Sequence, residues 1–233
     1  MSEQFSRTER LIGDAAMEKL KNSHVAVFGI GGVGSYTVEA LARAGVGTLT
    51  LIDSDVVAKS NINRQIIALH STVGRDKVLV AKERIADINQ NCNVFCHKKF
   101  VLPENLCEFE FDKFDYIVDA IDTVSAKLAL VENAEKHNIP IICSMGTGNK
   151  LNPLMFEVTD IYKTAVCPLA RVMRTELKKR GIKKLKVLYS KEEPIKIENV
   201  SEENRRSVPA SISFVPSAAG LIIAGEVIKD LIK

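Results

Sequence analysis

The segment LIDSDVVAKSNINRQ, residues 51–65, concentrates side chains that can bind charged oxygen atoms. It holds two aspartates, two asparagines, a glutamine and Arg64, and Lys77 follows it in the motif GRDK. Farther along the chain, Asp122 ends an apolar run. Arginine and lysine can neutralise the β- and γ-oxygens of a nucleoside triphosphate, and an aspartate can hold Mg²⁺. These residue types indicate chemistry at a nucleotide phosphate, with an ordinary surface loop and a salt bridge as the alternative.

A glycine-rich motif, GIGGVGS, precedes this segment and places Gly29, Gly31 and Gly34 in the spacing G-x-G-x-x-G. Glycines permit a tight turn, and the start of the following helix offers free N–H groups and a positive dipole end to a phosphate. Asp53 lies nineteen residues after Gly34, where it can accept hydrogen bonds from a ribose. The motif is not a Walker loop, because Ser35 stands where the lysine should be. The combination predicts nucleotide binding; a close-packed turn without a ligand is the alternative.

The identity of the nucleotide depends on how many cations surround it. NAD carries a pyrophosphate with about two charges, whereas ATP carries about four and normally binds with Mg²⁺. Arg64 and Lys77 supply additional positive charge, and Asn61 and Gln65 can fix Arg64 or bind oxygen atoms themselves. Asn63 fits a surface loop as well as it fits a ligand contact. The set favours ATP over NAD.

The elements that would position these residues alternate between strands and helices. Short apolar runs predict five strands, at 24–30, 48–53, 93–100, 114–122 and 140–146. Helical spacing predicts three helices, at 33–44, at 76–89 and from 123 to 137. This alternation predicts a Rossmann-like, doubly wound α/β fold with a mainly parallel sheet, in which ligands bind outside the carboxyl ends of the strands.

The chain is expected to form a single domain, 1–233, with further elements before and after this core. A helical arm at 5–20, within an N-terminal region 5–23, precedes the nucleotide-binding core, 24–150. A basic C-terminal extension, 151–233, follows. Its expected elements are strands at 154–161 and 186–190, an amphipathic helix at 168–180, a polar loop at 191–209, a strand at 211–214, a turn at Pro216 and a closing helix.

Composition and charge narrow the class of protein. The hydrophobic content of 46% is ordinary for a globular protein. Residues 1–149 carry 16 Lys+Arg and 19 Asp+Glu, whereas residues 150–233 carry 16 and 10, so the basic excess lies in the last third. Five cysteines without a Cys-x-x-Cys pair predict reduced thiols and argue against a four-cysteine zinc site. Neither a signal peptide nor a membrane span is expected, which predicts a soluble cytoplasmic protein.

The motif VAVFGIGGVGSYTVEALARAGVGTLTLIDSDVV, followed by SNINRQ, resembles the adenylation domain of the ubiquitin-activating superfamily, which includes bacterial adenylyltransferases of thiamine and molybdopterin synthesis. That family splits ATP at the α-phosphate to make a carboxyl adenylate. The resemblance implies that Asp53 binds ribose and that Asp122 lies at the metal. Arg64 and Lys77 would bind phosphates. The arm motif RTERLIG implies that Arg10 reaches into the site of a partner subunit in a homodimer.

The motifs PLARVMRTELKKRGIKKLKVLYSKEEP and SISFVPSAAGLIIAGEVIKDLI resemble the tRNA threonylcarbamoyladenosine dehydratases. That family activates the carboxylate of a modified adenosine beside the anticodon; a neighbouring carbamoyl group closes a ring and AMP leaves, for a net loss of water. The basic segment 171–186 fits contacts with RNA phosphates, and a solvated helix face is the alternative. Its expected apolar face consists of Leu169, Val172, Met173 and Leu177. Cys167 stands where that family commonly has an acid, and it is not expected to be a catalytic thiol.

The resulting hypothesis is an enzyme that uses ATP and Mg²⁺ to dehydrate threonylcarbamoyladenosine in tRNA. Three alternatives stay open: a sulfur-carrier-protein adenylyltransferase, an NAD-dependent dehydrogenase, and a nucleotide-binding RNA-binding module without catalysis. A sulfur-transfer protein is a further partner that the resemblance leaves open. The expected catalytic residues are Arg64, Lys77, Asp122 and Arg10. The expected nucleotide-binding residues are Gly29, Gly31, Gly32, Gly34, Asp53, Asp55, Asn61, Arg64, Gln65, Lys77, Val101 and Asp122, with the adenine near Phe100 and Val101. The region 151–233 is expected to bind the tRNA substrate, and the expected tRNA-binding residues are Arg171, Arg174, Lys178, Lys179, Arg180, Lys183 and Lys184.

Overall fold

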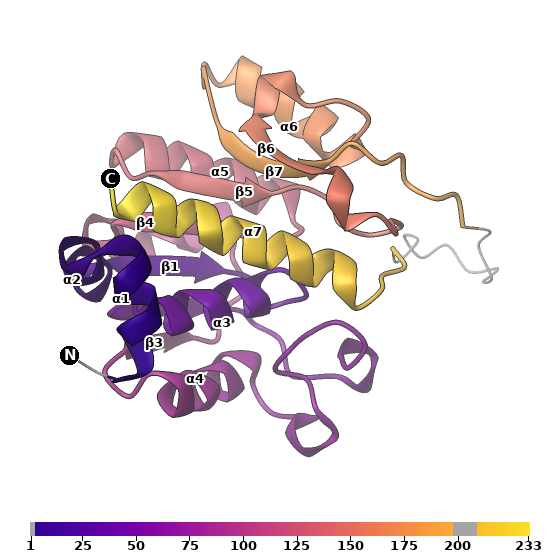
Figure 1. The fold of residues 1–233 in the computed structure, drawn as a ribbon. Coiled ribbons are helices and arrows are strands. Elements are labelled where there is room, and N and C mark those ends of the chain that lie inside the picture. Colours follow the sequence, from indigo (N-terminus) through magenta and orange to yellow (C-terminus); the bar gives the residue numbers. More distant parts are fainter. Residues whose placement is uncertain (1–2, 198–208) are drawn as a thin grey trace.

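A seven-stranded sheet runs through the centre of the protein (Figure 1). The structure is a computed structural model, and it describes residues 3–197 and 209–233. The strands are β1 (His24–Phe28), β2 (Thr48–Ile52), β3 (Asn93–His97), β4 (Tyr116–Asp119), β5 (Ile141–Ser144), β6 (Phe156–Asp160) and β7 (Lys186–Ser190). Their order is β3-β2-β1-β4-β5-β7-β6, and all neighbours are parallel except β6 and β7. The predicted doubly wound α/β fold is confirmed.

Helices cover both faces of the sheet. One face carries α3 (Gly34–Ala44), α4 (Lys77–Ile88) and α7 (Phe214–Leu231), and the other carries α5 (Val124–Lys136) and α6 (Pro168–Lys179). The N-terminal arm consists of a 3-10 helix (Glu3–Phe5), α1 (Ser6–Ile12) and α2 (Asp14–Asn22). Further 3-10 helices are Lys59–Asn61, His70–Thr72, Pro103–Glu108, Phe111–Lys113, Pro153–Met155 and Ile161–Lys163.

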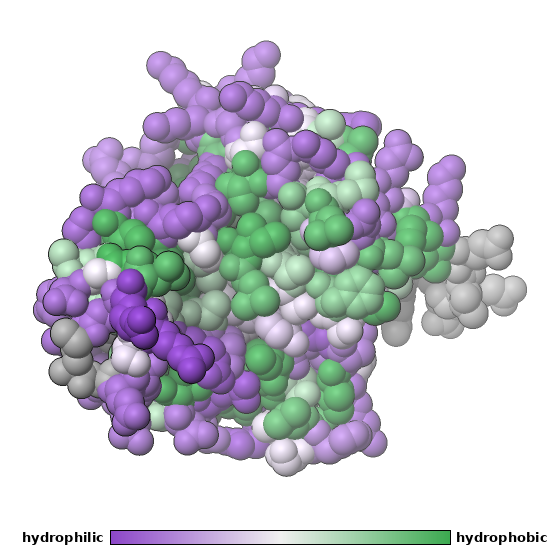
Figure 2. All heavy atoms as spheres, viewed as in Figure 1, coloured by the Kyte–Doolittle hydropathy of each residue, from purple (hydrophilic) through white to green (hydrophobic). Residues whose placement is uncertain are grey.

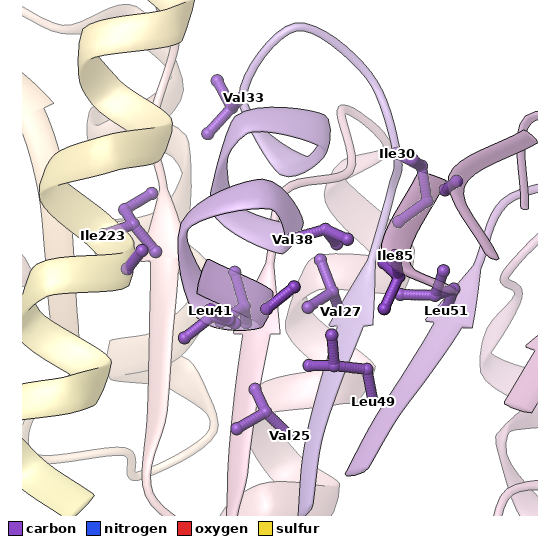
Figure 3. Packing of buried hydrophobic residues seen from close by; sticks show 14 of the residues in the cluster. Val25, Val27, Ile30, Val33, Val38, Leu41, Leu49, Leu51, Ile85 and Ile223 are labelled. Atoms are coloured by element: carbon purple, nitrogen blue, oxygen red, sulfur yellow. The ribbon is translucent and has the colours of Figure 1, made fainter. Parts of the chain in front are cut away.

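The core explains why β1 is apolar at every position after His24. In β1, Val25 and Val27 belong to the cluster under α3 and α7, whereas Ala26 and Phe28 belong to the cluster under α5. Successive side chains of a strand point to opposite faces, so a strand covered on both faces must be apolar throughout. Figure 3 shows part of the first cluster, in which Val25 and Val27 of β1 lie close to Val38 and Leu41 of α3 and Leu51 of β2 lies close to Ile85 of α4.

Several predicted boundaries are wrong. The arm is broken at Gly13, whose φ of 84° lies in the left-handed region that glycine adopts without strain. No strand forms at 211–214 in the described chain, and Pro216 makes no turn, because α7 begins at Phe214 and Pro216 lies in its first turn. Proline is tolerated there since the first N–H groups of a helix have no partner within it. Most of the loop predicted at 191–209, namely 198–208, lies outside the described residues.

The order of the strands determines where a ligand can bind. Strand β1 pairs with β2 on one side and with β4 on the other. The first half of the sheet is therefore built outward from one side of β1, and the second half from its other side. Helices then depart to opposite faces and open a crevice at the carboxyl ends of β1 and β4. The glycine loop follows β1, and Asp122 follows β4. No helix in the described ranges is long and apolar enough to cross a membrane.

Candidate functional site

A cavity of about 530 Å³ opens at the carboxyl edge of the sheet. Its size lies within the range of roughly 300–1,000 Å³ that is typical of small-molecule sites. Eleven of the twelve residues expected to bind a nucleotide line it: Gly29, Gly31, Gly32, Asp53, Asp55, Asn61, Arg64, Gln65, Lys77, Val101 and Asp122. Phe100, expected near the adenine, lines it too. The structure therefore brings together residues that are spread over almost a hundred positions of the sequence.

Gly34 is the expected residue that does not line the cavity. A Cβ atom at Gly34 would lie 1.8 Å from the carbonyl oxygen of Gly29, so only glycine allows α3 to start this close to β1. Gly29 itself has a φ of 91°, and a Cβ atom there would meet Ala120 O at 2.7 Å. The role of Gly34 is thus close packing of the loop rather than contact with a ligand.

Asp53 ties the glycine loop to the end of β2. Its Oδ2 accepts a hydrogen bond from the Ile30 N–H at 2.6 Å, and its Oδ1 accepts one from the Asp55 N–H at 2.9 Å. Burial raises the pKa of Asp53 above its usual value, although the nearby Lys77 ammonium opposes the shift. Each carboxylate oxygen can accept a second hydrogen bond, so contact with a ribose remains compatible with this arrangement.

The two expected phosphate-binding cations are held in different ways. The Lys77 side chain is 5% exposed, and its Nζ lies 2.7 Å from Asp55 Oδ2 and 3.9 Å from Asp53 Oδ1. Arg64 donates from Nη1 to Ser60 O and to Asn63 Oδ1, both at 2.9 Å, and it has no carboxylate partner within the described residues. An anionic ligand would compete with Asp55 for Lys77, whereas the charge of Arg64 is available without that exchange.

Asp122 is the carboxylate expected at the metal. It is exposed at the edge of the cavity, where Oδ1 accepts a hydrogen bond from Thr123 Oγ1 at 3.4 Å. The described residues contain no group of three or more His, Cys, Asp and Glu side chains that could hold a metal ion. Magnesium usually binds through one or two carboxylates together with substrate phosphates and water. The site therefore fits Mg²⁺ bound between Asp122 and a phosphate, and it does not fit a cage made of protein ligands.

One wall of the cavity was missed by the sequence analysis. It consists of Gly146, Thr147, Gly148, Pro209 and Ser211, which come from the loop after β5 and from the segment before α7. Asn149 joins these two parts, because its N–H donates to Ala210 O and its Oδ1 accepts from the Ala210 N–H, both at 2.7 Å. From the other side, Asn63 donates from Nδ2 to Ser211 O at 3.0 Å. Asn63 therefore links Arg64 to this wall, which its position in NINRQ did not reveal.

The basic segment after Cys167 does not line the cavity, although Leu169 at the start of α6 does. Its apolar face differs from the prediction: Ala170, Met173 and Leu177 are buried, whereas Val172 is 45% exposed. A spacing of three and then four residues keeps the buried set on one side of the helix, and Val172 lies off that side.

The seven bases expected to bind tRNA fall into two groups. Arg174 donates from Nη1 to Thr164 O at 2.9 Å, and Lys179 and Arg180 form ion pairs with Glu176. The other four are exposed and have no ion-pair partner within the described residues; they are Arg171, Lys178, Lys183 and Lys184. Arg10 is exposed on α1 and does not line the cavity of its own chain.

Residues 5–233 match the sequence profile of the ThiF family. The chain belongs to the ThiF family. A tRNA threonylcarbamoyladenosine dehydratase of Bacillus subtilis is 48% identical over 244 residues, which covers 100% of this chain and 96% of that protein. Among solved structures, the tRNA N6-threonylcarbamoyladenosine dehydratase TcdA of E. coli in complex with AMP has a TM-score of 0.90 at 34% identity, covering 98% of this chain and 94% of that one. Its complex with ATP has a TM-score of 0.88 at the same identity, covering 98% and 93%.

This ThiF-family match includes the whole C-terminal region. Both relatives align with nearly all of this chain and with nearly all of their own length, so the likeness covers α6, β7 and α7 as well as the core. The part of the chain that carries the exposed bases is therefore shared with proteins named tRNA threonylcarbamoyladenosine dehydratases.

Proposed function

We propose that the protein uses ATP to dehydrate and cyclise threonylcarbamoyladenosine in tRNA. The observation that carries the proposal is the cavity in which the glycine loop, Asp53, Arg64, Lys77 and Asp122 converge. The relatives add the substrate: one that aligns over the whole chain is named a tRNA threonylcarbamoyladenosine dehydratase, and the similar E. coli enzyme has been crystallised with ATP and with AMP.

The first step would be adenylation of a carboxylate. An oxygen of the substrate carboxylate attacks the α-phosphorus of ATP, and the bond to pyrophosphate breaks. Arg64 and Lys77 would neutralise the charge that builds up on pyrophosphate, with Lys77 exchanging Asp55 for a phosphate oxygen. Mg²⁺, when bound by Asp122 and the phosphates, supplies further neutralisation. No general base is needed because a carboxylate is already ionised at neutral pH.

The second step would close a ring within the substrate. The carbamoyl group attacks the acyl carbon of the mixed anhydride and releases one N–H proton to solvent, the bond from the acyl carbon to the AMP oxygen breaks, and AMP leaves, so that the modified nucleoside has lost one water. The attack is intramolecular, so the main tasks of the protein are orientation and the exclusion of water. An enzyme nucleophile is not required, and the burial of Cys167 agrees with a structural rather than a catalytic thiol.

The tRNA would extend from the cavity along α6. Leu169 lines the cavity, and Arg171 begins the set of exposed bases two residues later. Exposed lysines and arginines bind RNA mainly through phosphates, and each contact makes binding more sensitive to salt. A substrate nucleoside in the cavity and its flanking phosphates on the basic segment fit this order of residues.

A homodimer would complete the site with Arg10 of a second copy. Figure 2 shows hydrophobic residues gathered on the face where α7 lies in Figure 1; Phe214 and Leu221 of α7 are about half exposed. Burial of this apolar surface in a twofold interface is supported by the general preference for such dimers. We place the enzyme in the cytoplasm, where its tRNA substrate and reducing conditions for its five free cysteines coincide.

Pyrophosphate exchange distinguishes the proposal from its closest rival. With labelled pyrophosphate and ATP, we expect label in ATP only when tRNA carrying threonylcarbamoyladenosine is present. Stimulation by a sulfur-carrier protein with a C-terminal glycine, and not by this tRNA, would instead identify a sulfur-carrier adenylyltransferase. A thermal shift with NAD equal to that with ATP and Mg²⁺ would contradict adenylation altogether, since a ligand stabilises only the state that it binds.

A further inference from the structure

Asp119 and Lys127 form an ion pair in which both side chains are 0% exposed. Asp119 ends β4, Lys127 lies near the start of α5, and Nζ is 2.9 Å from Oδ2. Moving two charges out of water costs free energy that their attraction seldom returns in full, so an apolar pair of similar size is often equally stable. Stability alone therefore does not explain why a buried ion pair occupies these two positions.

The contacts of the pair supply a reason, because both partners hold the same residue. Asp119 Oδ2 accepts no hydrogen bond within the described residues, although Lys127 Nζ lies close to it. Lys127 Nζ instead donates a hydrogen bond to Ile121 O at 2.9 Å. Asp119 Oδ1 accepts the Ile121 N–H at 3.2 Å. Both backbone polar groups of Ile121 are thus fixed from beneath, one residue before Asp122.

The opposite side of this turn faces the cavity. Ala120, Ile121, Asp122 and Thr123 all line it. The glycine loop rests against the same turn: a Cβ atom at Gly29 would lie 2.7 Å from Ala120 O and 3.0 Å from Ile121 N. Movement of the Ala120–Ile121 peptide would therefore displace both the loop that would cradle phosphates and the carboxylate that would hold Mg²⁺.

We propose that the buried Asp119–Lys127 pair is a positioning device for the nucleotide site. It holds the Ala120–Thr123 turn so that Asp122 and the glycine loop keep their places relative to the phosphates. The inference rests on the proposed function, because it assumes that the cavity binds ATP with Mg²⁺. Lys127 and Asp119 touch no substrate and act through the backbone of Ile121.

Three variants separate positioning from charge compensation: Lys127→Met, Asp119→Asn, and the double variant. Calorimetry would measure the affinity for ATP with and without Mg²⁺, and a thermal melt would measure stability. Lys127→Met should lower Tm and weaken ATP–Mg²⁺ binding by about 10- to 100-fold, the usual loss when a residue that orients a ligand group is removed. Asp119→Asn keeps an acceptor for the Ile121 N–H and the donor to Ile121 O, so it should lose less affinity.

The double variant is decisive because it leaves no uncompensated charge. It should regain thermal stability, yet stay about 10-fold or more weaker for ATP–Mg²⁺, since Ile121 O still lacks its donor. If Lys127→Met alone does not fold, the double variant carries the test. Lys186→Met is the matched control. It breaks a partly buried ion pair with Glu226 and Asp230 at the amino ends of the strands, away from the cavity. It should lower Tm without changing the affinity for ATP–Mg²⁺.

Recovery of full ATP–Mg²⁺ affinity in the double variant would mean that Lys127 only neutralises the charge of Asp119, and it would overturn the inference. An equal loss of affinity in the Lys186→Met control would also overturn it, because the effect would then follow general stability. A parental protein that binds no ATP would overturn the proposed function, and this inference with it. That failure is recognised before any variant is compared.

Discussion

The cavity and the basic segment hold their charged residues in opposite ways. In the cavity, Lys77 is nearly buried against Asp55, and Arg64 is bound to its own loop and to Asn63. On the basic segment, the bases not used in internal contacts point into solvent. Chemistry at a phosphorus atom depends on placement to within a fraction of an ångström, whereas attraction of RNA depends on charge and tolerates mobile side chains. The two regions should therefore respond differently to substitution.

The largest effect is expected in the cavity. Arg64→Ala should lower kcat by about 100- to 1,000-fold, because it removes a charge that acts mainly in the transition state. The fold should remain intact, since the Arg64 hydrogen bonds given above stay within residues 60–64. Lys59→Ala is the matched control, as Lys59 is an exposed cation of the same segment that does not line the cavity. Loss of activity without loss of tRNA binding would also exclude a non-catalytic RNA-binding module; unchanged kcat would remove Arg64 from the chemistry.

A smaller and distinctive signal, the partial return of activity when two inactive variants are mixed, is expected from Arg10, which does not line the cavity of its own chain. Arg10→Ala and Asp122→Ala should each be nearly inactive alone. After mixed unfolding and refolding, half of the dimers should be hybrids with one intact site, so about a quarter of parental activity should return. Activity would be measured on the mixture after mass spectrometry has shown subunit exchange. A mixture as inactive as its parents would mean that Arg10 acts within its own chain or not at all.

The smallest effects are expected on the basic segment. They should differ between its exposed bases and those that make internal contacts. Alanine at Arg171, Lys178, Lys183 and Lys184 should raise the KM for tRNA and flatten its salt dependence, by about 0.7–0.9 in logarithmic slope per lost phosphate contact. Binding of ATP should not change. Arg174→Ala should mainly lower the Tm of the protein, because Arg174 donates a hydrogen bond to Thr164 O. An unaltered salt slope in the fourfold variant would return the segment to a solvated helix face.

The sequence predicted the parts of the site whose signal is local. Gly29 and Asp53 directly follow β1 and β2, Gly34 and Lys77 start α3 and α4, and Arg64 lies in the loop between β2 and α4. The crevice rule for parallel sheets then places them at one edge, where the structure has them. The predicted strands extended past Phe28 and Asp119 because the apolar run continues into loops that the core also buries, as the burial of Ile30 shows.

The parts that were missed depend on contacts between distant segments. Asn149 gains its role by hydrogen bonding to Ala210, which is far away in the chain, and nothing in the motif GTGNK indicates this partner. Lys127 looks like one of many helix lysines until its burial beside Asp119 is known. The strand expected at 211–214 is absent from the described chain because α7, which packs against the distant helix α3, begins at Phe214.

Mass spectrometry of tRNA nucleosides tests the central claim most directly. The purified protein would be incubated with ATP, Mg²⁺ and tRNA that carries threonylcarbamoyladenosine, and the tRNA would then be digested under conditions that preserve a labile ring. We expect the nucleoside to lose the mass of one water, with AMP and pyrophosphate released in equal amounts and no loss without ATP. An unchanged nucleoside mass in the presence of a protein that binds both ATP and this tRNA would contradict the proposed function.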